Sequence, residues 1–284
     1  GGVSCAALVH NHIPGTPSSW GIVEGIQLWR VRSVGQYLYA PLSPVFPRVL
    51  NQAIQTFRPH LLHFHLPNLS AFWALCIPAA RRIPWIIQWQ SDVVPSRIDV
   101  RLRLAYPFYR PFEQAVLKKA GRVIVASPTY LEASIPLRSW VAKCRVVPLG
   151  VDPERVAMPA PESLVAAEES WGRASLRILA VGRLTYYKGF HLLIQAMSAL
   201  PASVKVQIVG TGPLISSLEK EVNERRLEGR VHLGGEATDR RLRGLFASGD
   251  LFCVPSIERT EAFGIVLVEA MRYGKPVVAT DIPG

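Results

Sequence analysis

The sequence predicts an α/β protein built on parallel sheets. Short β-branched runs alternate with longer helical patterns, first between residues 61 and 149 and again between residues 176 and 279. This alternation is typical of parallel sheets in which a crossover helix follows each strand. A Pro-, Glu- and Ala-rich passage, residues 153–174, separates the two series, and 284 residues suffice for two domains. We therefore expect a first domain over residues 1–172 and a second over 173–284.

The strands of the first domain are β-branched or aromatic runs bounded by turn residues. We expect them at Gly1–Val9, Leu61–His65, Trp85–Trp89, Val123–Ala126 and Arg145–Leu149. Gly21–Val31 predicts an antiparallel excursion, and the proline-rich stretch Tyr39–Pro47 predicts a loop.

The second domain repeats the pattern. We expect strands at Leu176–Gly182, Val204–Val209, Val231–Leu233, Leu251–Val254 and Val277–Ala279, and helices at His191–Leu200 and Ile265–Arg272. Because α/β folds bind ligands at the carboxyl ends of parallel strands, the residues that follow these strands are the candidates for a site.

Two acids, Glu261 and Glu269, lie on either side of a predicted helix start. Gly264 permits a ligand to approach the backbone closely, and the first amides of a helix attract phosphate. At about 100° per residue the two acids do not share a helical face, so a ligand touching both would lie across the helix start. A nucleotide sugar, with one acid for each sugar ring, would suit this arrangement. A loop acid and a salt-bridged helical Glu account for the same spacing.

Two cations follow the strand at Leu176–Gly182. Arg183 and Lys188 lie in a loop bounded by Gly182 and Gly189, at the expected carboxyl edge of the sheet. They could hold a diphosphate between them, Arg through its planar fork and Lys as a point charge. Two solvated surface cations are the common alternative.

Glycines end the neighbouring strands. Gly210 and Gly212 resemble half of a dinucleotide fingerprint, but the third glycine is missing and Ile215 stands where a small residue is needed. We expect a tight strand-to-helix turn whose amides border the ligand, and no dinucleotide cofactor. The strand that begins at Val231 ends in glycines at the same edge, where its main chain could pair with a base. No Asp-x-Asp or other carboxylate cluster indicates a magnesium site, so we expect no metal.

The net charge is +11, and residues 1–172 carry 17 Lys and Arg against 10 Asp and Glu. Basic and aromatic residues alternate between Arg97 and Arg122, which suits the surface of an anionic bilayer. A solvated basic surface and nucleic-acid binding are the alternatives, but no nucleic-acid-binding motif accompanies the charge. No apolar run is long enough to span a membrane. We expect a cytoplasmic protein, peripheral to the inner face of the cell membrane, with no nucleic-acid partner.

The cysteines are far apart in apolar contexts and lack the spacing of a zinc site. We expect buried thiols in a reducing compartment at Cys5, Cys76, Cys144 and Cys253.

Taken together and in this order, the motifs resemble the retaining glycosyltransferases of family four, which have the GT-B fold. The motifs are Gly182-Arg183…Lys188-Gly189, Gly210-x-Gly212-Pro213, Val231-His-Leu-Gly234, Asp250–Ser256, Glu261-Ala-Phe-Gly264…Glu269 and, in the first half, Leu61–Pro67, Trp85–Val93, Ala126–Tyr130 and Val146–Asp152. The resemblance implies two Rossmann-like domains with parallel sheets facing across a cleft. The first would bind the acceptor and the second a nucleotide-sugar donor.

The resemblance also implies roles for residues of the second domain. Arg183 and Lys188 would neutralise the donor diphosphate, and Glu269 would accept hydrogen bonds from the ribose hydroxyls. The transferred hexose would be held by Glu261 and by the amides of Phe263, Gly264 and Ile265. Retention is usually explained by a front-face reaction in which the departing phosphate helps to deprotonate the acceptor, so no protein nucleophile is expected.

The implied activity is metal-independent hexosyl transfer to a lipid-linked or saccharide acceptor in surface polysaccharide synthesis. The approach to the acidic motif, Ser256–Gly264, resembles that of mannosyltransferase-like members, which favours GDP-mannose as the donor.

One position departs from the family pattern. Gln90 stands where members commonly carry the second His of His-x-His-Ser-Asp. Gln can hydrogen-bond but cannot take a charge. It therefore preserves positioning, or it marks a weakened or inactive scaffold that binds sugar nucleotides or membranes. His63 and His65 lie on one face of a nearby strand, where His65 either borders the site or is structural.

The family pattern also implies that both domains are incomplete. A first strand and its helix should precede Gly1, and a C-terminal strand and helices should follow Gly284. Residues 1–284 alone would then expose sheet edges and apolar faces, so we expect them to be marginally stable and inactive.

Overall fold

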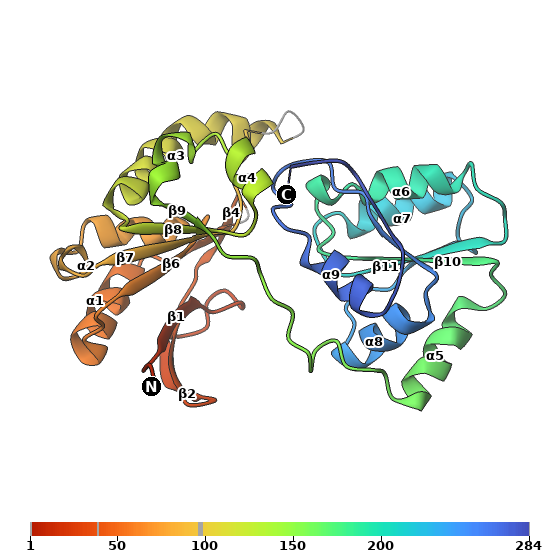
Figure 1. Ribbon diagram of the computed structural model, residues 1–284, viewed down its shortest axis with the longest axis horizontal. Coiled ribbons are helices and arrows are strands. Elements are labelled where there is room, and N and C mark those ends of the chain that lie inside the picture. The colour runs from red at the N-terminus through yellow and green to blue at the C-terminus, as the bar shows by residue number, and fades with distance from the viewer. Residues whose placement is uncertain (1, 39, 96–98, 284) are drawn as a thin grey trace. The chain divides into compact units, whose positions relative to one another are not determined.

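The computed structural model describes residues 2–38, 40–95 and 99–283. It divides into two compact units, Gly1–Val147 and Pro148–Gly284 (Figure 1). Residues 148–172, which we expected in the first domain, lie in the second unit. The reason is helix α5 (Pro161–Trp171), which packs on α8 (Asp239–Ser248). Trp171 is buried there and donates a hydrogen bond of 2.9 Å from its indole nitrogen to Ser248 Oγ.

A four-stranded parallel sheet forms the centre of the first unit. Its order is β6 (Leu62–Leu66), β7 (Trp85–Trp89), β8 (Arg122–Val125) and β9 (Cys144–Val146), close to the predicted strands. Trp85, Ile87 and Trp89 alternate into the core, as a period of two requires. The helical segments of this unit are α1 (Phe46–Phe57), η1 (Leu69–Leu75), α2 (Pro78–Arg82), α3 (Val100–Lys119), α4 (Pro128–Ala133) and η2 (Arg138–Lys143).

A second sheet lies before α1 in the sequence. Strand β1 (Ala6–His10) pairs in parallel with β3 (Ile26–Val31), and β3 pairs antiparallel with β2 (Ser19–Val23). The predicted antiparallel excursion is therefore confirmed.

The predicted loop at Tyr39–Pro47 is wrong. Strands β4 (Gly35–Tyr37) and β5 (Ala40–Leu42) form a hairpin, and α1 begins at Phe46; Tyr39 itself lies outside the described residues. Pro47 did not prevent the helix, because it occupies the first turn of α1, where no intrahelical N–H is needed.

The prediction of four buried thiols holds only in part. Cys144 is buried and Cys253 is half-buried, but Cys5 and Cys76 are exposed. Cys76 follows the last turn of η1, and Cys5 precedes β1, so neither lies inside a packed element.

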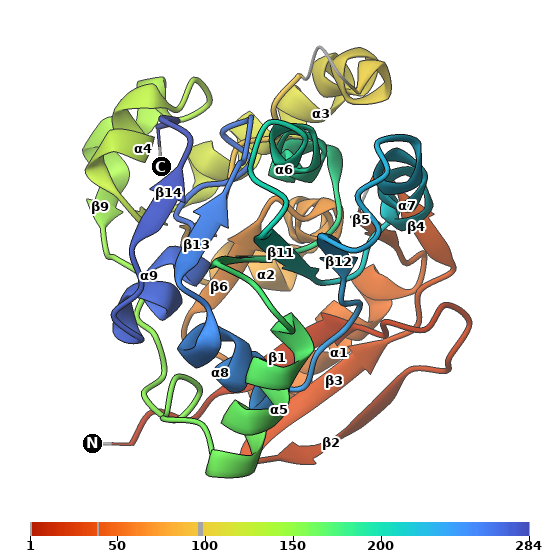
Figure 2. The same cartoon turned by 90° about the vertical axis from the view of Figure 1, so that its right-hand side faces the viewer.

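The second unit is a five-stranded parallel sheet with helices on both faces (Figures 1 and 2). Its order is β12 (Val231–Leu233), β11 (Val204–Val209), β10 (Leu176–Val181), β13 (Leu251–Val254) and β14 (Val277–Ala279). Its helical segments are α5, η3 (Tyr186–Lys188), α6 (Phe190–Met197), α7 (Ile215–Glu224), α8 and α9 (Ile265–Arg272).

Side chains of β10 show how the two faces are covered. Ile178 and Ala180 pack in a core with α6 and α7, whereas Leu179 packs in a second core with α5, α8 and α9. This doubly wound α/β arrangement is the predicted fold class. No helix in the described ranges is long and apolar enough to cross a bilayer.

Candidate nucleotide-sugar site

The strand order of the second unit places a topological switch point between β10 and β13. The chain runs from β10 outward to β11 and β12, and then returns so that β13 lies on the other side of β10. In open α/β sheets, ligands bind at the carboxyl ends of strands at such a point. The loop after β10 carries Arg183 and Lys188, and the loop after β13 carries Ser256 and Glu261.

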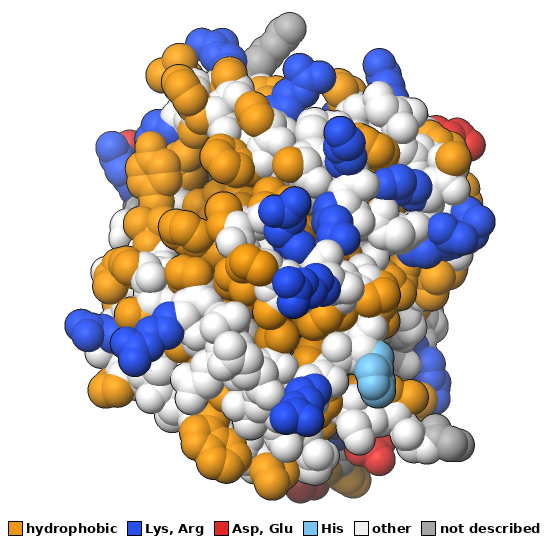
Figure 3. All heavy atoms as spheres, turned by 90° about the vertical axis from the view of Figure 1, so that its left-hand side faces the viewer, with side chains coloured by type: hydrophobic (Ala, Val, Ile, Leu, Met, Phe, Trp, Pro, Cys, Tyr) orange, Lys and Arg blue, Asp and Glu red, His pale blue; other side chains and the backbone are white. Residues whose placement is uncertain are grey.

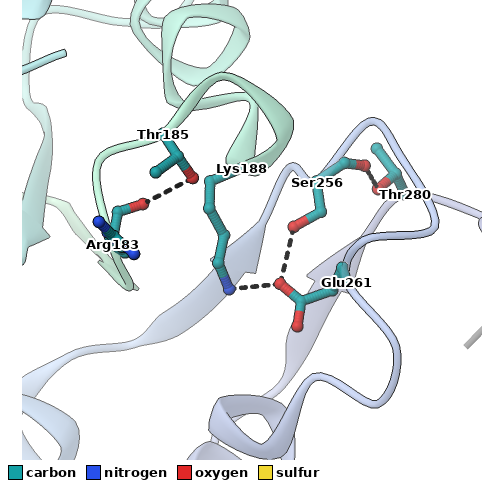
Figure 4. Close-up of polar contacts among 6 residues, drawn as sticks. All are labelled: Arg183, Thr185, Lys188, Ser256, Glu261 and Thr280. Carbon is teal, nitrogen blue, oxygen red and sulfur yellow. Dashed lines mark hydrogen bonds and ion pairs between the residues drawn. The ribbon is translucent and has the colours of Figure 1, made fainter. Parts of the chain in front are cut away.

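The structure brings Lys188 and Glu261 into direct contact (Figure 4). Lys188 Nζ donates to Glu261 Oε2, which also accepts a hydrogen bond of 3.1 Å from Ser256 Oγ. The two charged side chains are only 12% and 16% exposed, so solvent screens their interaction less than that of a surface pair. Arg183 is exposed on the same loop as Lys188. The cation and the acid predicted for diphosphate and hexose therefore form one cluster.

Main-chain hydrogen bonds connect the loops along this edge. Gly182 N donates to Val209 O, and Gly210 N donates to Gly235 O, at 2.9 and 2.8 Å. Ile257 N donates to Tyr187 O at 2.8 Å, which joins the loops after β13 and β10. These hydrogen bonds join the loops that carry the site residues into one connected edge, which we call the rim.

The glycines predicted near the ligand have a packing role in this rim. Gly210 has φ +142°, and a Cβ there would lie 2.0 Å from Gly182 O. A Cβ on Gly212 would lie 2.4 Å from Leu184 O. Gly210 and Gly212 thus let two backbone segments touch, and the Gly210 N–H is already bonded to Gly235 O. Gly182 differs, because a Cβ there would lie 3.3 Å from Lys188 Cε.

Helix α9 begins where the sequence predicts. Gly264 precedes its first residue in the left-handed region, at φ 65°, which favours glycine. Leu267 N returns to Gly264 O at 2.7 Å. The amides of Ile265 and Val266 lie between them, at the helix start, where N–H groups have no intrahelical partner and can receive an anion. Phe263 lies directly before Gly264, between Glu261 and this helix start.

Glu269 belongs to a different cluster from Glu261. Its side chain is buried, and Glu269 Oε1 lies 3.3 Å from Arg155 Nε in an ion pair. Burial raises the pKa of Glu269, Arg155 opposes that shift and Asp239 adds to it. Glu269 Oε2 is buried without a hydrogen-bond partner in the described part of the chain. Glu269 is thus the salt-bridged helical Glu that was one of the two interpretations of the sequence. Its Oε2 atom can still accept a hydrogen bond.

Val231 does not reach the edge of the sheet that carries the site. It is the first residue of β12, its side chain is buried in the core, and its N–H donates to Leu227 O at 2.8 Å. The carboxyl end of β12 is at Leu233, followed by Gly234.

In the first unit, Gln90 follows β7 and contacts His65 of β6. Gln90 Nε2 lies 3.3 Å from His65 Nδ1. His63 and His65 share a face, as predicted, with ring centroids 4.8 Å apart. Burial lowers the pKa of His63, and His65 lowers it further. Gln90 is therefore hydrogen-bonded to a residue of the neighbouring strand, and its role in positioning stays a prediction.

A buried network supports the loop that carries Gln90. Asp92 Oδ1 accepts hydrogen bonds from Trp89 Nε1 at 2.9 Å and Ser134 Oγ at 2.7 Å. Asp92 N donates to the Tyr130 hydroxyl. Because this network ties the end of β7 to α4, it orients the backbone at Gln90.

Sequence reasoning missed Ser256 and Arg155 as site residues. Ser256 follows β13 at the switch point, so the same edge argument could have found it. Arg155 lies in the segment between the two units' sheets, and no sequence signal pairs it with Glu269.

The expectation of a metal-independent site stays a prediction. Within residues 2–38, 40–95 and 99–283, no group of three or more His, Cys, Asp or Glu side chains is arranged to hold a metal ion.

Comparison with known proteins agrees with this geometry. The family model described as Glycosyl transferase 4-like domain matches residues 2–150, and that described as Glycosyl transferases group 1 matches residues 168–284. Among solved structures, sucrose-phosphate synthase from Thermosynechococcus elongatus superposes with a TM-score of 0.77 at 22% identity, covering 98% of this chain and 71% of that one. This likeness shows the GT-B fold.

Two curated relatives are similar in sequence. D-rhamnosyltransferase WbpZ of Pseudomonas aeruginosa is 33% identical over 199 residues, covering 70% of this chain and 49% of the relative. O-antigen chain mannosyltransferase C of Escherichia coli is 29% identical over 221 residues, covering 78% and 55%. The chain thus spans about half the length of these relatives. With one family model covering more than half of its residues and a second covering most of the rest, the chain belongs to the family-four, group 1 glycosyltransferases.

Proposed function

We propose that the protein transfers a hexose from a nucleoside-diphosphate sugar to a saccharide or lipid-linked acceptor during surface polysaccharide assembly at the inner face of the cell membrane. The observation that carries this proposal is the Lys188–Glu261–Ser256 cluster at the switch point, with Arg183 exposed beside it. At this position a cation can bind the diphosphate of a nucleotide sugar, and an acid can accept hydrogen bonds from the sugar hydroxyls.

The ion pair suggests how the donor is received. A diphosphate offers Lys188 a stronger partner than one carboxylate, because it carries more charge and more acceptor oxygens. Lys188 would then turn from Glu261 to the diphosphate, joined by Arg183. Glu261 would be released to accept hydrogen bonds from hexose hydroxyls, with Ser256 still holding Oε2.

Glu269 is the residue proposed for the ribose. Its Oε2 atom can accept a hydrogen bond from a ribose hydroxyl, but that atom is buried. We propose that the Arg155 side chain, which is 56% exposed and ion-paired to the other oxygen, moves to open this atom to the ribose.

We propose a retaining transfer in which the protein supplies positioning and charge. The bond between the anomeric carbon and the diphosphate oxygen breaks, and the acceptor oxygen bonds to the same face of that carbon. The acceptor proton passes to the departing phosphate. Arg183 and Lys188 would stabilise the charge that develops on the leaving group; removing one such aimed donor typically costs ~10²–10³-fold in turnover.

We propose a manno-configured donor, with GDP-mannose as the first choice. In support, the two similar proteins are named a D-rhamnosyltransferase and a mannosyltransferase, and D-rhamnose is the 6-deoxy form of D-mannose.

Transfer assays on the full-length protein with GDP-mannose, GDP-D-rhamnose and UDP-glucose test the donor. Activity with UDP-glucose and none with the two GDP sugars would overturn the donor proposal. Lys188→Ala is expected to lower turnover ~10²–10³-fold, while Lys220→Ala, on the exposed face of α7 in the same unit, leaves it unchanged. Calorimetric donor binding without turnover would instead support a non-catalytic scaffold.

A further inference from the structure

We propose that the solvent-facing side of α3 docks on the surface of an anionic lipid bilayer. This inference rests on the membrane location in the proposed function, names the surface that makes the contact, and can be tested without any transferase activity.

An apolar stripe runs along α3. Val100, Leu104, Phe108 and Phe112 recur every four residues, which places them on neighbouring turns of one face. Leu104, Phe108 and Phe112 are 66%, 79% and 53% exposed. A solvated helix face is ordinarily polar. Leu104 and Phe108, the most exposed residues of the stripe, therefore form an apolar surface that the protein leaves largely in water.

The core side of α3 is a different face from that of Leu104 and Phe108. Glu113, Val116 and Leu117 are its buried residues. Phe112 stacks on Phe72 of η1, with ring centroids 5.6 Å apart, which holds the helix to the unit. Phe112 therefore lies where the stripe meets the protein, and Leu104 and Phe108 are the stripe residues that face solvent.

Charge is divided sharply between the two units. Residues 1–147 contain 16 Lys and Arg against five Asp and Glu, whereas residues 148–284 contain 16 of each, so the whole net charge of +11 lies in the first unit. Of the five acids in the first unit, Asp92, Asp99 and Glu113 are buried.

The surface of α3 is basic, like that of the first unit as a whole. Its exposed charged residues are cations, namely Arg101, Arg103, Arg110, Lys118 and Lys119, and its only acid is Glu113. Arg101 is paired with Asp99 at the helix start; Arg97, part of the predicted basic segment, lies outside the described residues. Figure 3 shows the side of the molecule that bears α1, α2 and α3, where hydrophobic and basic side chains dominate and acidic ones are few.

The combination identifies the partner. Exposed cations are attracted to anionic headgroups at about 1 kcal/mol each near the surface, and Leu and Phe side chains gain by entering the acyl boundary. A nucleic acid would satisfy the cations but leave Leu104 and Phe108 in water. An anionic bilayer satisfies both sets.

Vesicle sedimentation of the full-length protein tests this inference, with phosphatidylcholine vesicles made with and without phosphatidylglycerol. We expect binding only with phosphatidylglycerol. Phe108→Ser should lower vesicle affinity about tenfold, whereas Trp20→Ser, which removes a similarly exposed aromatic from β2 (69% exposed), should leave it unchanged.

The charge arm uses two pairs of variants of equal net charge. Arg103→Ala with Arg110→Ala should weaken binding about fivefold per cation. Arg173→Ala with Lys220→Ala, exposed positions of the second unit, should have a much smaller effect.

Three results would overturn the inference. They are equal binding to both kinds of vesicle, no binding to either, and oligonucleotide binding that is lost with the Arg103/Arg110 double variant but retained with Phe108→Ser. Donor binding measured on the same variants separates this inference from the proposed function, since α3 carries none of the donor-binding residues.

Discussion

The buried acid of α3 gives the structure's sharpest stability prediction. Glu113 is fully buried, its Oε2 atom accepts a hydrogen bond of 3.1 Å from the Tyr106 hydroxyl, and its Oε1 atom has no hydrogen-bond partner among the described residues. Burial raises the pKa of Glu113 from 4.5 to about 7, Asp92 contributes to the rise, and hydrogen bonds from Tyr106 and Gln114 together with the charge of Arg110 oppose it.

The direction in which stability changes with pH follows from the number of protons bound by the folded and unfolded states. Because the carboxyl of Glu113 has a higher pKa in the folded chain, the native state binds more protons than the unfolded state between pH 4.5 and about 7. Stability therefore falls as pH rises through this window. At ~1.4 kcal/mol per pH unit, the carboxylate costs about 3 kcal/mol above pH 7.

Glu113→Gln should remove that cost while keeping an acceptor for Tyr106. We expect the variant to be more stable than the native protein by about 3 kcal/mol at pH 8, with the difference vanishing below pH 4.5. Guanidinium denaturation over a pH series measures it, with buried Trp85 and Trp89 reporting on the first unit. Glu132→Gln, an exposed acid of α4, is the matched control. A gain that is the same at every pH, or absent at pH 8, would refute the desolvation argument.

Two further substitutions test the rim and the position that departs from the family pattern. Gly210→Ala would put a Cβ 2.0 Å from Gly182 O. We expect it to destabilise the second unit by at least ~3 kcal/mol in thermal or chemical unfolding. Gly229→Ala is the control and should be nearly neutral, because a Cβ there meets nothing within 4 Å. Gln90→Ala should lower turnover about tenfold by removing the contact with His65, and Gln90→His should stay within a few-fold of the native enzyme; activation by orders of magnitude would show instead that Gln weakens catalysis.

Strand positions in the second unit were predictable because a strand covered on both faces is apolar along most of its length. The run Leu176–Val181 and its neighbours are buried on both faces, which leaves continuous apolar runs. The prediction for Tyr39–Pro47 was wrong because it relied on proline as a loop signal. Proline marks loops on average, but an N–H is dispensable at a helix start, and only the tertiary context places Pro47 there.

The edge of the sheet that carries the site was predictable, but its pairings were not. Parallel strands put Arg183, Lys188 and Glu261 at one edge. That Lys188 meets Glu261 depends on strand order, because the two residues lie 73 positions apart on loops that become neighbours only when β13 returns beside β10. The Arg155–Glu269 pair likewise depends on residues 148–172 packing with the second unit.

The position of the domain boundary decides where the net charge of the protein lies. With residues 148–172 in the second unit, that unit has no net charge and the first holds all of it. A neutral unit has little long-range field to attract an anionic donor, so donor affinity must come from Arg183 and Lys188 at short range. Lys188 is only 12% exposed, and salt screens such contacts weakly. A bilayer approaching the basic unit is instead attracted by many exposed cations, which salt screens strongly. Raising ionic strength should therefore release the protein from anionic vesicles while changing its donor affinity much less, and a donor affinity that fell in parallel with vesicle binding would contradict this separation.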